Sequence, residues 1–221
     1  ARALVDDWIR SCGYWQDTAW EQQVVARRVL AWLSQSPLIL EGCDREFYRR
    51  FLRSLARQVR YLRRTMNETP DGVPRLQAAI AVAAATVSMS GQGRFVRQSL
   101  RRLDQELARQ ILADGGHISR NPAALLDILV DLLPVRQALT VQGMPASATV
   151  MQAIDRMMPM IRFFRHGDGT FAHFNGMGAT PVDLVATILA YDDARGGPPG
   201  NAPHSGYQRV TCGDTLMLMD T

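Results

Sequence analysis

The sequence contains no lysine, so all 25 of its basic residues are arginines, set against 21 Asp and Glu. The simple explanation for arginine in place of lysine is coding bias in a GC-rich genome. The functional alternative is that the protein binds planar anions, since a guanidinium pairs with a carboxylate or sulfate through two parallel hydrogen bonds. The formal net charge of +4 over 221 residues is too small a basic excess to indicate nucleic-acid binding.

Cysteine and long apolar runs are also scarce. Cys12, Cys43 and Cys212 lie far apart and form neither a zinc-type pair nor a disulfide framework. No apolar run reaches the roughly 18 residues that a membrane span needs, and the longest, residues 78–89, fits a buried helix. The 47% of apolar and 21% of charged residues exclude disordered, collagenous and disulfide-scaffold classes.

Helical periodicity dominates residues 1–194. Asp44 is a plausible N-cap, and apolar residues follow it at helical spacing. These are Phe47, Phe51, Leu55, Val59 and Leu62. A long amphipathic helix followed by a more apolar one recurs about every 50 residues, although no strict sequence repeat is visible. This alternation favours the two concentric layers of an α/α toroid over an irregular helical bundle.

We therefore predict an all-α fold, an incomplete α/α toroid of helical hairpins over residues 1–195. Residues 196–205 form a Gly/Pro linker that cannot continue a helix. Residues 206–221 alternate apolar and polar side chains in the manner of strands, so we expect a β domain to start there. The chain starts within a helical pattern and ends within a strand pattern, so we expect it to be a piece of a longer protein.

All four histidines follow residue 116 and lie in predicted loops. A solvated or capping role is the simple interpretation of each one, but loops on a rigid helical frame are also where binding residues collect. The neutral and cationic residues of these loops suit an acidic ligand. They can neutralise the carboxylate of a uronic acid while a neighbouring carbon loses a proton. This chemistry is β-elimination by a polysaccharide lyase, and it needs no cofactor.

Two other kinds of site fit the loops less well. His166, Asp168 and His173 match no helix-based ligand motif, so we predict no metal. A glycoside hydrolase would need two opposed carboxylates, for which Asp114 and Asp168 are the candidates. Each precedes a glycine, however, and is also a plausible turn former.

Three stretches together resemble the heparinase II/III-like proteins of bacteria: DGGHISRNP, HGDGTFAHFNG, and the Gly/Pro linker with PHSGYQR. That family joins an N-terminal α/α toroid to a C-terminal β-sandwich, and the resemblance runs from about Trp32 to the end of the chain. It implies the toroid half and the first strands of the sandwich. It also implies cleavage of uronic-acid polysaccharides such as glycosaminoglycans, and a periplasmic location.

The resemblance also assigns roles to residues. In the family's lyases a DG-containing loop supplies the Asn or His that neutralises the substrate carboxylate, and His117 matches it. Arg120 stands where the family has Glu. The next loop has Phe171 and His173 but no tyrosine, so His173 is the candidate proton carrier. The predicted substrate-binding residues are Arg120, Asn121, His166, Asp168 and Asn175. A non-catalytic carbohydrate-binding protein on the same fold remains an alternative, as does a glycoside hydrolase.

Overall fold

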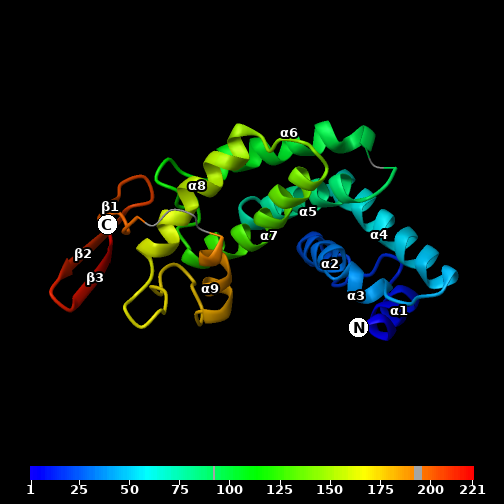
Figure 1. Ribbon diagram of the computed structural model, residues 1–221, viewed down its shortest axis with the longest axis horizontal. Helices are drawn as coiled ribbons and strands as arrows, with labels where there is room; N and C mark the ends of the chain where they lie inside the picture. Colours follow the sequence, from blue (N-terminus) through cyan, green and yellow to red (C-terminus); the bar gives the residue numbers. More distant parts are fainter. Residues whose placement is uncertain (92, 192–195) are drawn as a thin grey trace. The chain divides into compact units, whose positions relative to one another are not determined.

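The computed structural model describes residues 1–91, 93–191 and 196–221. The chain divides into two compact units, residues 1–103 and 104–221, and each is described by itself (Figure 1). The predicted end of the helical domain at residue 195 lies outside the described residues.

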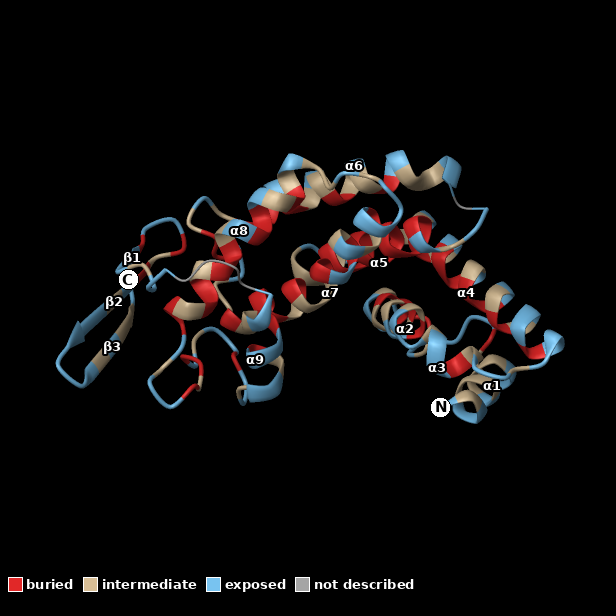
Figure 2. Ribbon diagram, in the orientation of Figure 1, coloured by how far each residue is buried: buried red, intermediate tan, exposed pale blue. Residues whose placement is uncertain are grey.

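The regular structure that is described in the first unit consists of helices. It contains α1 (Arg2–Ser11), α2 (Gln22–Ser34), α3 (Ser36–Leu40), α4 (Arg45–Thr65), α5 (Val73–Ser88) and the start of α6 (Gly93–Gln110). Helix α2 packs against both α4 and α5. Every residue of α5 from 76 to 87 is buried, as the predominance of red on this helix shows (Figure 2). The apolar run in the sequence therefore predicted this helix correctly.

Helix α4 shows how the sequence pattern becomes packing. The Asp44 carboxylate accepts a hydrogen bond from the Phe47 amide at 2.7 Å, so Asp44 is the N-cap, as predicted. The apolar residues spaced along α4 are all buried, whereas its arginines lie on the remaining faces. The buried set is Phe47, Phe51, Leu55, Val59 and Leu62.

In its described residues, 104–191 and 196–221, the second unit contains the end of α6, three helices and a small sheet. Its elements are α7 (Pro122–Val141), α8 (Ala148–Phe163), α9 (Val182–Ala190), β1 (Asn201–Ala202), β2 (Tyr207–Cys212) and β3 (Thr215–Asp220). Helix α7 packs against α8 and α9. In the antiparallel order β1-β2-β3, Cys212 pairs with Thr215. This pairing leaves a two-residue hairpin turn, in which Gly213 has a φ of 56°.

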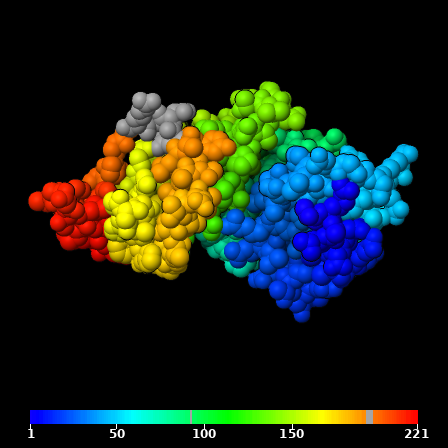
Figure 3. All heavy atoms as spheres, turned by 60° about the horizontal axis from the view of Figure 1, so that its bottom comes forward, coloured from blue at the N-terminus to red at the C-terminus, as the bar shows by residue number. Residues whose placement is uncertain are grey.

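The strands confirm the change of pattern read from the sequence, and β1 lies inside the predicted linker, residues 196–205. They lie beside the loop that follows α8, where red and yellow atoms adjoin (Figure 3). Arg209 of β2 donates hydrogen bonds to the carbonyl oxygens of Phe163 and Arg165, at 2.6 and 3.0 Å. Among the helices of the described ranges, none combines the length and apolar character that a membrane crossing requires.

The buried face of α4 leads to a stability prediction. Leu62 has no exposed surface, so Leu62→Ala should lower the free energy of unfolding by about 2–5 kcal/mol through lost contacts and a residual cavity. Leu38→Ala is the matched control, because Leu38 is 57% exposed and its loss should change stability by no more than about 0.5 kcal/mol. Urea unfolding of the full-length protein, followed by helical circular dichroism, measures both. Equal losses would contradict the packing of α4.

Candidate functional site

The two predicted binding loops contain the same backbone turn. In the loop between α6 and α7, Ile111 and His117 form an isolated antiparallel bridge. In the loop between α8 and α9, Arg165 and Phe171 form the same bridge. The sequence placed these loops at equivalent points of successive hairpins, and the turn gives them equivalent backbone positions. His117 therefore takes the position that Phe171 takes in the second loop.

An aspartate closes each of these turns. The Asp114 carboxylate accepts a hydrogen bond from the Gly116 amide at 3.0 Å, and the Asp168 carboxylate accepts one from the Thr170 amide at 2.9 Å. The glycine after each aspartate has a φ of +89°, a conformation that other residues rarely adopt. Both aspartates are therefore turn formers. Hydrogen bonds from the Thr170 hydroxyl and amide hold the pKa of the exposed Asp168 carboxyl below its ordinary value.

His117 lies on the buried side of its loop and is only 2% exposed. Its Nδ1 accepts a hydrogen bond from the Ser119 amide at 3.0 Å and also lies 2.8 Å from the Ser119 hydroxyl. With Nδ1 as an acceptor, the neutral ring carries its proton on Nε2, which then donates to Oε1 of Gln110 at 2.9 Å. Phe171, at the equivalent position, is 1% exposed. A sugar would contact His117 only after this loop opened.

Arg120 faces the C-terminal segment of the chain. It has a positive φ of 56°, and its Nε donates to the carbonyl oxygen of Ser205 at 2.9 Å. Its Nη2 donates to the Gly206 carbonyl oxygen at 3.1 Å and forms an ion pair with the Asp220 carboxylate. The guanidinium of Arg120 thus joins the α6–α7 loop to the start of the β segment.

Tyr207, the first residue of β2, joins both loops. Its hydroxyl donates to the Arg120 carbonyl oxygen at 2.5 Å and accepts from Nδ2 of Asn175 at 2.7 Å. Its ring packs against Phe164 and Phe174, with centroids 5.0 and 5.1 Å away. Burial raises the pKa of Tyr207, although the hydrogen bond from Asn175 acts in the opposite direction. The sequence assigned no role to this residue, and its place at the start of an alternating strand pattern was the available signal.

Asp114 also holds the C-terminal segment. Besides closing its own turn, its carboxylate accepts from the amides of His204 and Ser205 at 2.8 and 2.7 Å, and from the Ser205 hydroxyl at 3.0 Å. Partial burial acts to raise the pKa of Asp114. The hydrogen bonds from Gly116, Ser205 and His204 outweigh it, so the pKa lies below the ordinary value.

The remaining predicted residues are distributed along the two loops. Asn121 is the N-cap of α7, accepting from the Ala123 amide at 2.8 Å. Asn175 donates to the carbonyl oxygen of Arg120 at 3.2 Å, so these two predicted residues lie together beside the buried tyrosine. His166 is half-buried and His173 is exposed. In the described part of the chain, no group of three or more His, Cys, Asp or Glu side chains is placed to hold a metal ion.

The hydrogen bonds of Asp114 predict a pH-dependent contribution to stability. Asp114→Asn should lower the free energy of unfolding at pH 7 by about 1 kcal/mol, a value reduced because the carboxylate is partly exposed. The folded pKa lies below the unfolded one, so this contribution is complete above the unfolded value of about 3.9. It is lost as the pH falls through the folded pKa.

The difference between the natural protein and Asp114→Asn should therefore be constant from pH 5 to 7 and shrink below about pH 4. Asp214→Asn, in the exposed hairpin turn, is the matched control and should leave stability unchanged. Urea unfolding at each pH provides the measurement. A difference that grew on acidification would contradict the assigned role of Asp114.

Comparison with known proteins gives one sequence relative and a clear structural likeness. No model of a known protein family matches the chain. The chain is 34% identical over 224 residues to FtsZ-localized protein C from Caulobacter vibrioides. That alignment covers all of this chain and 38% of the relative.

Two solved structures share the fold. The crystal structure of heparinase III matches with a TM-score of 0.71 and 17% identity, over 99% of this chain and 40% of that one. The heparan sulfate lyase HepC mutant from Pedobacter heparinus matches with a TM-score of 0.56 and 19% identity, over the same shares. The chain thus spans less than half the length of the proteins that it matches. These likenesses confirm the predicted fold: the chain has a heparinase-like helical toroid fold, present in part and followed by a partial β domain.

Proposed function

We propose that this chain is part of a bacterial protein that localises with FtsZ, and that its heparinase-like fold serves binding rather than polysaccharide cleavage. One observation carries the proposal. The chain aligns over its whole length, at 34% identity, with a protein named for its localisation with FtsZ. The lyases that share the fold are only 17–19% identical, and such a likeness concerns the fold alone.

The geometry of the two loops supports a non-catalytic role. A group that neutralises a substrate carboxylate must contact that carboxylate as charge develops on it. The His117 ring is buried, with hydrogen bonds to Gln110 and Ser119. The Arg120 guanidinium is bonded to the C-terminal segment, and the Tyr207 hydroxyl is bonded on both sides. These groups hold the second unit together.

A polysaccharide lyase is the second candidate, favoured by the shared fold and by the mixture of His, Arg and Asn in the loops. In this candidate, His117 neutralises the carboxylate of an acidic polysaccharide and the exposed His173 moves the proton. Arg120, Asn121, His166, Asp168 and Asn175 bind the sugar, and a periplasmic location goes with this activity. The loop would have to open to expose His117. A glycoside hydrolase has less support, since Asp114 and Asp168 each close a turn.

Localisation tests the leading proposal. The full-length protein, fused to a fluorescent protein and expressed in its own host, should form bands that coincide with FtsZ. The bands should disperse when FtsZ is depleted, because the proposed position depends on FtsZ. The fluorescent protein alone, at the same expression level, is the control. An even distribution of the fusion in cells with intact FtsZ bands would contradict the proposal.

Activity separates the two candidates. The full-length protein is incubated with heparan sulfate, alginate and hyaluronan, and the ultraviolet absorbance of unsaturated uronate is followed over time. We expect no increase, because His117, the group that would neutralise the substrate carboxylate, is buried and hydrogen-bonded to Gln110 and Ser119. A steady increase would establish the lyase and contradict the non-catalytic proposal. Binding without an increase would identify a carbohydrate-binding protein.

His117→Ala tests the structural role of the buried ring. Its removal leaves Oε1 of Gln110 and the amide of Ser119 without their bonds to the ring, so the free energy of unfolding should fall by about 1–3 kcal/mol. His173→Ala is the control, since His173 is exposed and its substitution should leave stability unchanged. Chemical unfolding measures both variants. Equal stability of the His117 variant and the natural protein would show that the ring does not hold the loop.

A further inference from the structure

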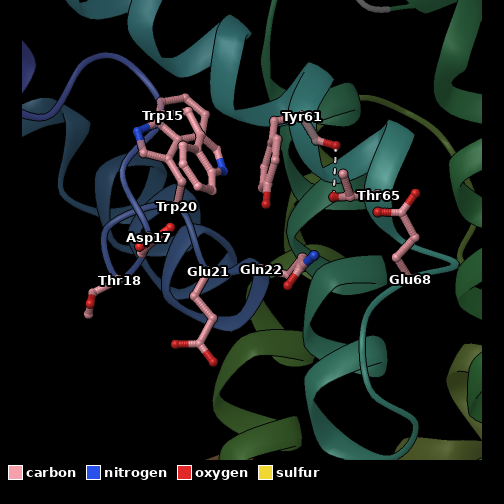
Figure 4. Close-up of a pocket in the computed structure, with 9 residues that line it drawn as sticks. All are labelled: Trp15, Asp17, Thr18, Trp20, Glu21, Gln22, Tyr61, Thr65 and Glu68. Atoms are coloured by element: carbon pink, nitrogen blue, oxygen red, sulfur yellow. Dashed lines mark hydrogen bonds between the residues drawn. The ribbon is translucent and has the colours of Figure 1, made fainter.

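A cavity of about 620 Å³, wide open to solvent, is lined only by residues of the first unit, whereas the residues that the sequence singled out for chemistry belong to the second unit. Its walls come from the segment between α1 and α2, the start of α2, and the last turns of α4 with the residues that follow (Figure 4). The volume is within the range of roughly 300–1,000 Å³ that is usual for ligand sites. The cavity is therefore large enough to accept a side chain or a small molecule.

One wall of the cavity is aromatic. Trp20 is 4% exposed, and its indole nitrogen donates to the Cys12 carbonyl oxygen at 2.8 Å. The Trp20 ring meets the Tyr61 ring edge-on, with centroids 5.2 Å apart, so both rings are held in place. Trp15 also lines the cavity, but it is 67% exposed. It therefore offers a large indole surface to a ligand.

Acidic residues among the other lining groups give the cavity a negative charge. The carboxylates of Asp17, Glu21 and Glu68 line it, and all three residues are exposed. In the described ranges, no hydrogen bond or ion pair involves these three carboxylates. No lining residue is basic, although the chain has 25 basic residues. Burial raises the pKa of Tyr61, a hydrogen bond with Thr65 acts in the opposite direction, and the Glu68 charge adds a smaller increase.

Carboxylates and exposed aromatic faces together favour a cation. They disfavour an acidic polysaccharide, whose charges the three carboxylates would repel. The same part of the chain already pairs aromatic rings with arginine. Arg28 lies over the Trp8 ring at 3.8 Å, and Arg57 over the Tyr14 ring at 4.8 Å. Among the described residues, no such arginine lies over Trp15.

We propose that this cavity binds an arginine side chain of a basic peptide segment, with the guanidinium stacked on Trp15 and attracted by the acidic residues that line the same cavity. A guanidinium is planar and can stack on an indole while it donates two hydrogen bonds to a carboxylate. Because Trp15 is exposed, a group at the end of a long side chain can reach it while the peptide backbone stays in solvent. This inference goes beyond the proposed function and does not depend on it.

The test is an isothermal titration calorimetry experiment, in which the full-length protein is titrated with a short blocked peptide, Gly-Arg-Arg-Gly. Binding should be saturable and should weaken as salt is raised, because the attraction is partly between exposed charges. Trp15→Ala should weaken it about tenfold through loss of the stacking surface. Tyr48→Ala is the matched control, since Tyr48 is an aromatic residue of α4 that is 44% exposed outside the cavity. It should leave binding unchanged.

Charge variants give a second test that is independent of Trp15. Glu21→Gln and Glu68→Gln together should weaken binding several-fold and flatten its salt dependence, whereas Glu41→Gln, an exposed residue outside the cavity, should do neither. Circular dichroism confirms that each variant is folded. Binding unchanged in folded Trp15→Ala, or equal binding of Gly-Glu-Glu-Gly, would overturn the proposal. Preference for a neutral or acidic oligosaccharide over the arginine peptide would also overturn it.

Discussion

The buried hydroxyl of Tyr207 is the group on which the loops of the second unit depend. It donates to the carbonyl oxygen of Arg120 and accepts from the amide of Asn175, so one phenol connects β2 with both helix-connecting loops. A buried polar group without partners is costly, and each partner therefore constrains the position of the others. Arg120 and Asn175 both have positive φ angles, and their contacts with Tyr207 help hold those conformations. Asp114 fastens the same segment through three hydrogen bonds to His204 and Ser205.

This network changes how the loop residues are interpreted. His, Arg and Asn in a Gly-rich loop indicate a site for an acidic ligand, because these types can donate hydrogen bonds to a carboxylate. The same capacity lets them bond carbonyl oxygens and carboxylates of the chain itself, as Arg120 does with Ser205 and Asp220. The equivalent positions of His117 and Phe171 explain how an imidazole fits the buried side of this turn. One turn geometry places a hydrocarbon ring and an imidazole at the same buried position, and the imidazole is accommodated there because Gln110 and Ser119 bond its nitrogens.

The helices were predictable because their signals are local. The Asp44 cap, the apolar spacing along α4 and the apolar run of α5 each depend on residues within a few turns. The hairpin of β2 and β3 was predictable for the same reason, through alternation and the Gly213 turn. The partners of the loop residues were not, because Arg120 and Ser205 are 85 positions apart, and Asp114 and Ser205 are 91 apart. The cavity likewise depends on the end of α4 and the residues after it, which bring Tyr61 and Glu68 beside residues 15–22.

The structure also gives a second explanation for the many arginines of the chain. From the sequence alone, a chain whose basic residues are all arginine suggests a negatively charged ligand. Yet several arginines are engaged within the molecule, over the rings of Trp8, Tyr14 and Tyr207. Burial lowers the pKa of Arg28 to about 10, which shows how far one guanidinium has left the solvent. Stacking on an aromatic face suits arginine better than lysine, because the guanidinium is planar and more weakly hydrated. In the described part of the chain no arginine lies over Trp15, and three acidic residues line the same cavity. The proposed guanidinium ligand is therefore the same kind of cation that the chain places on its other aromatic rings.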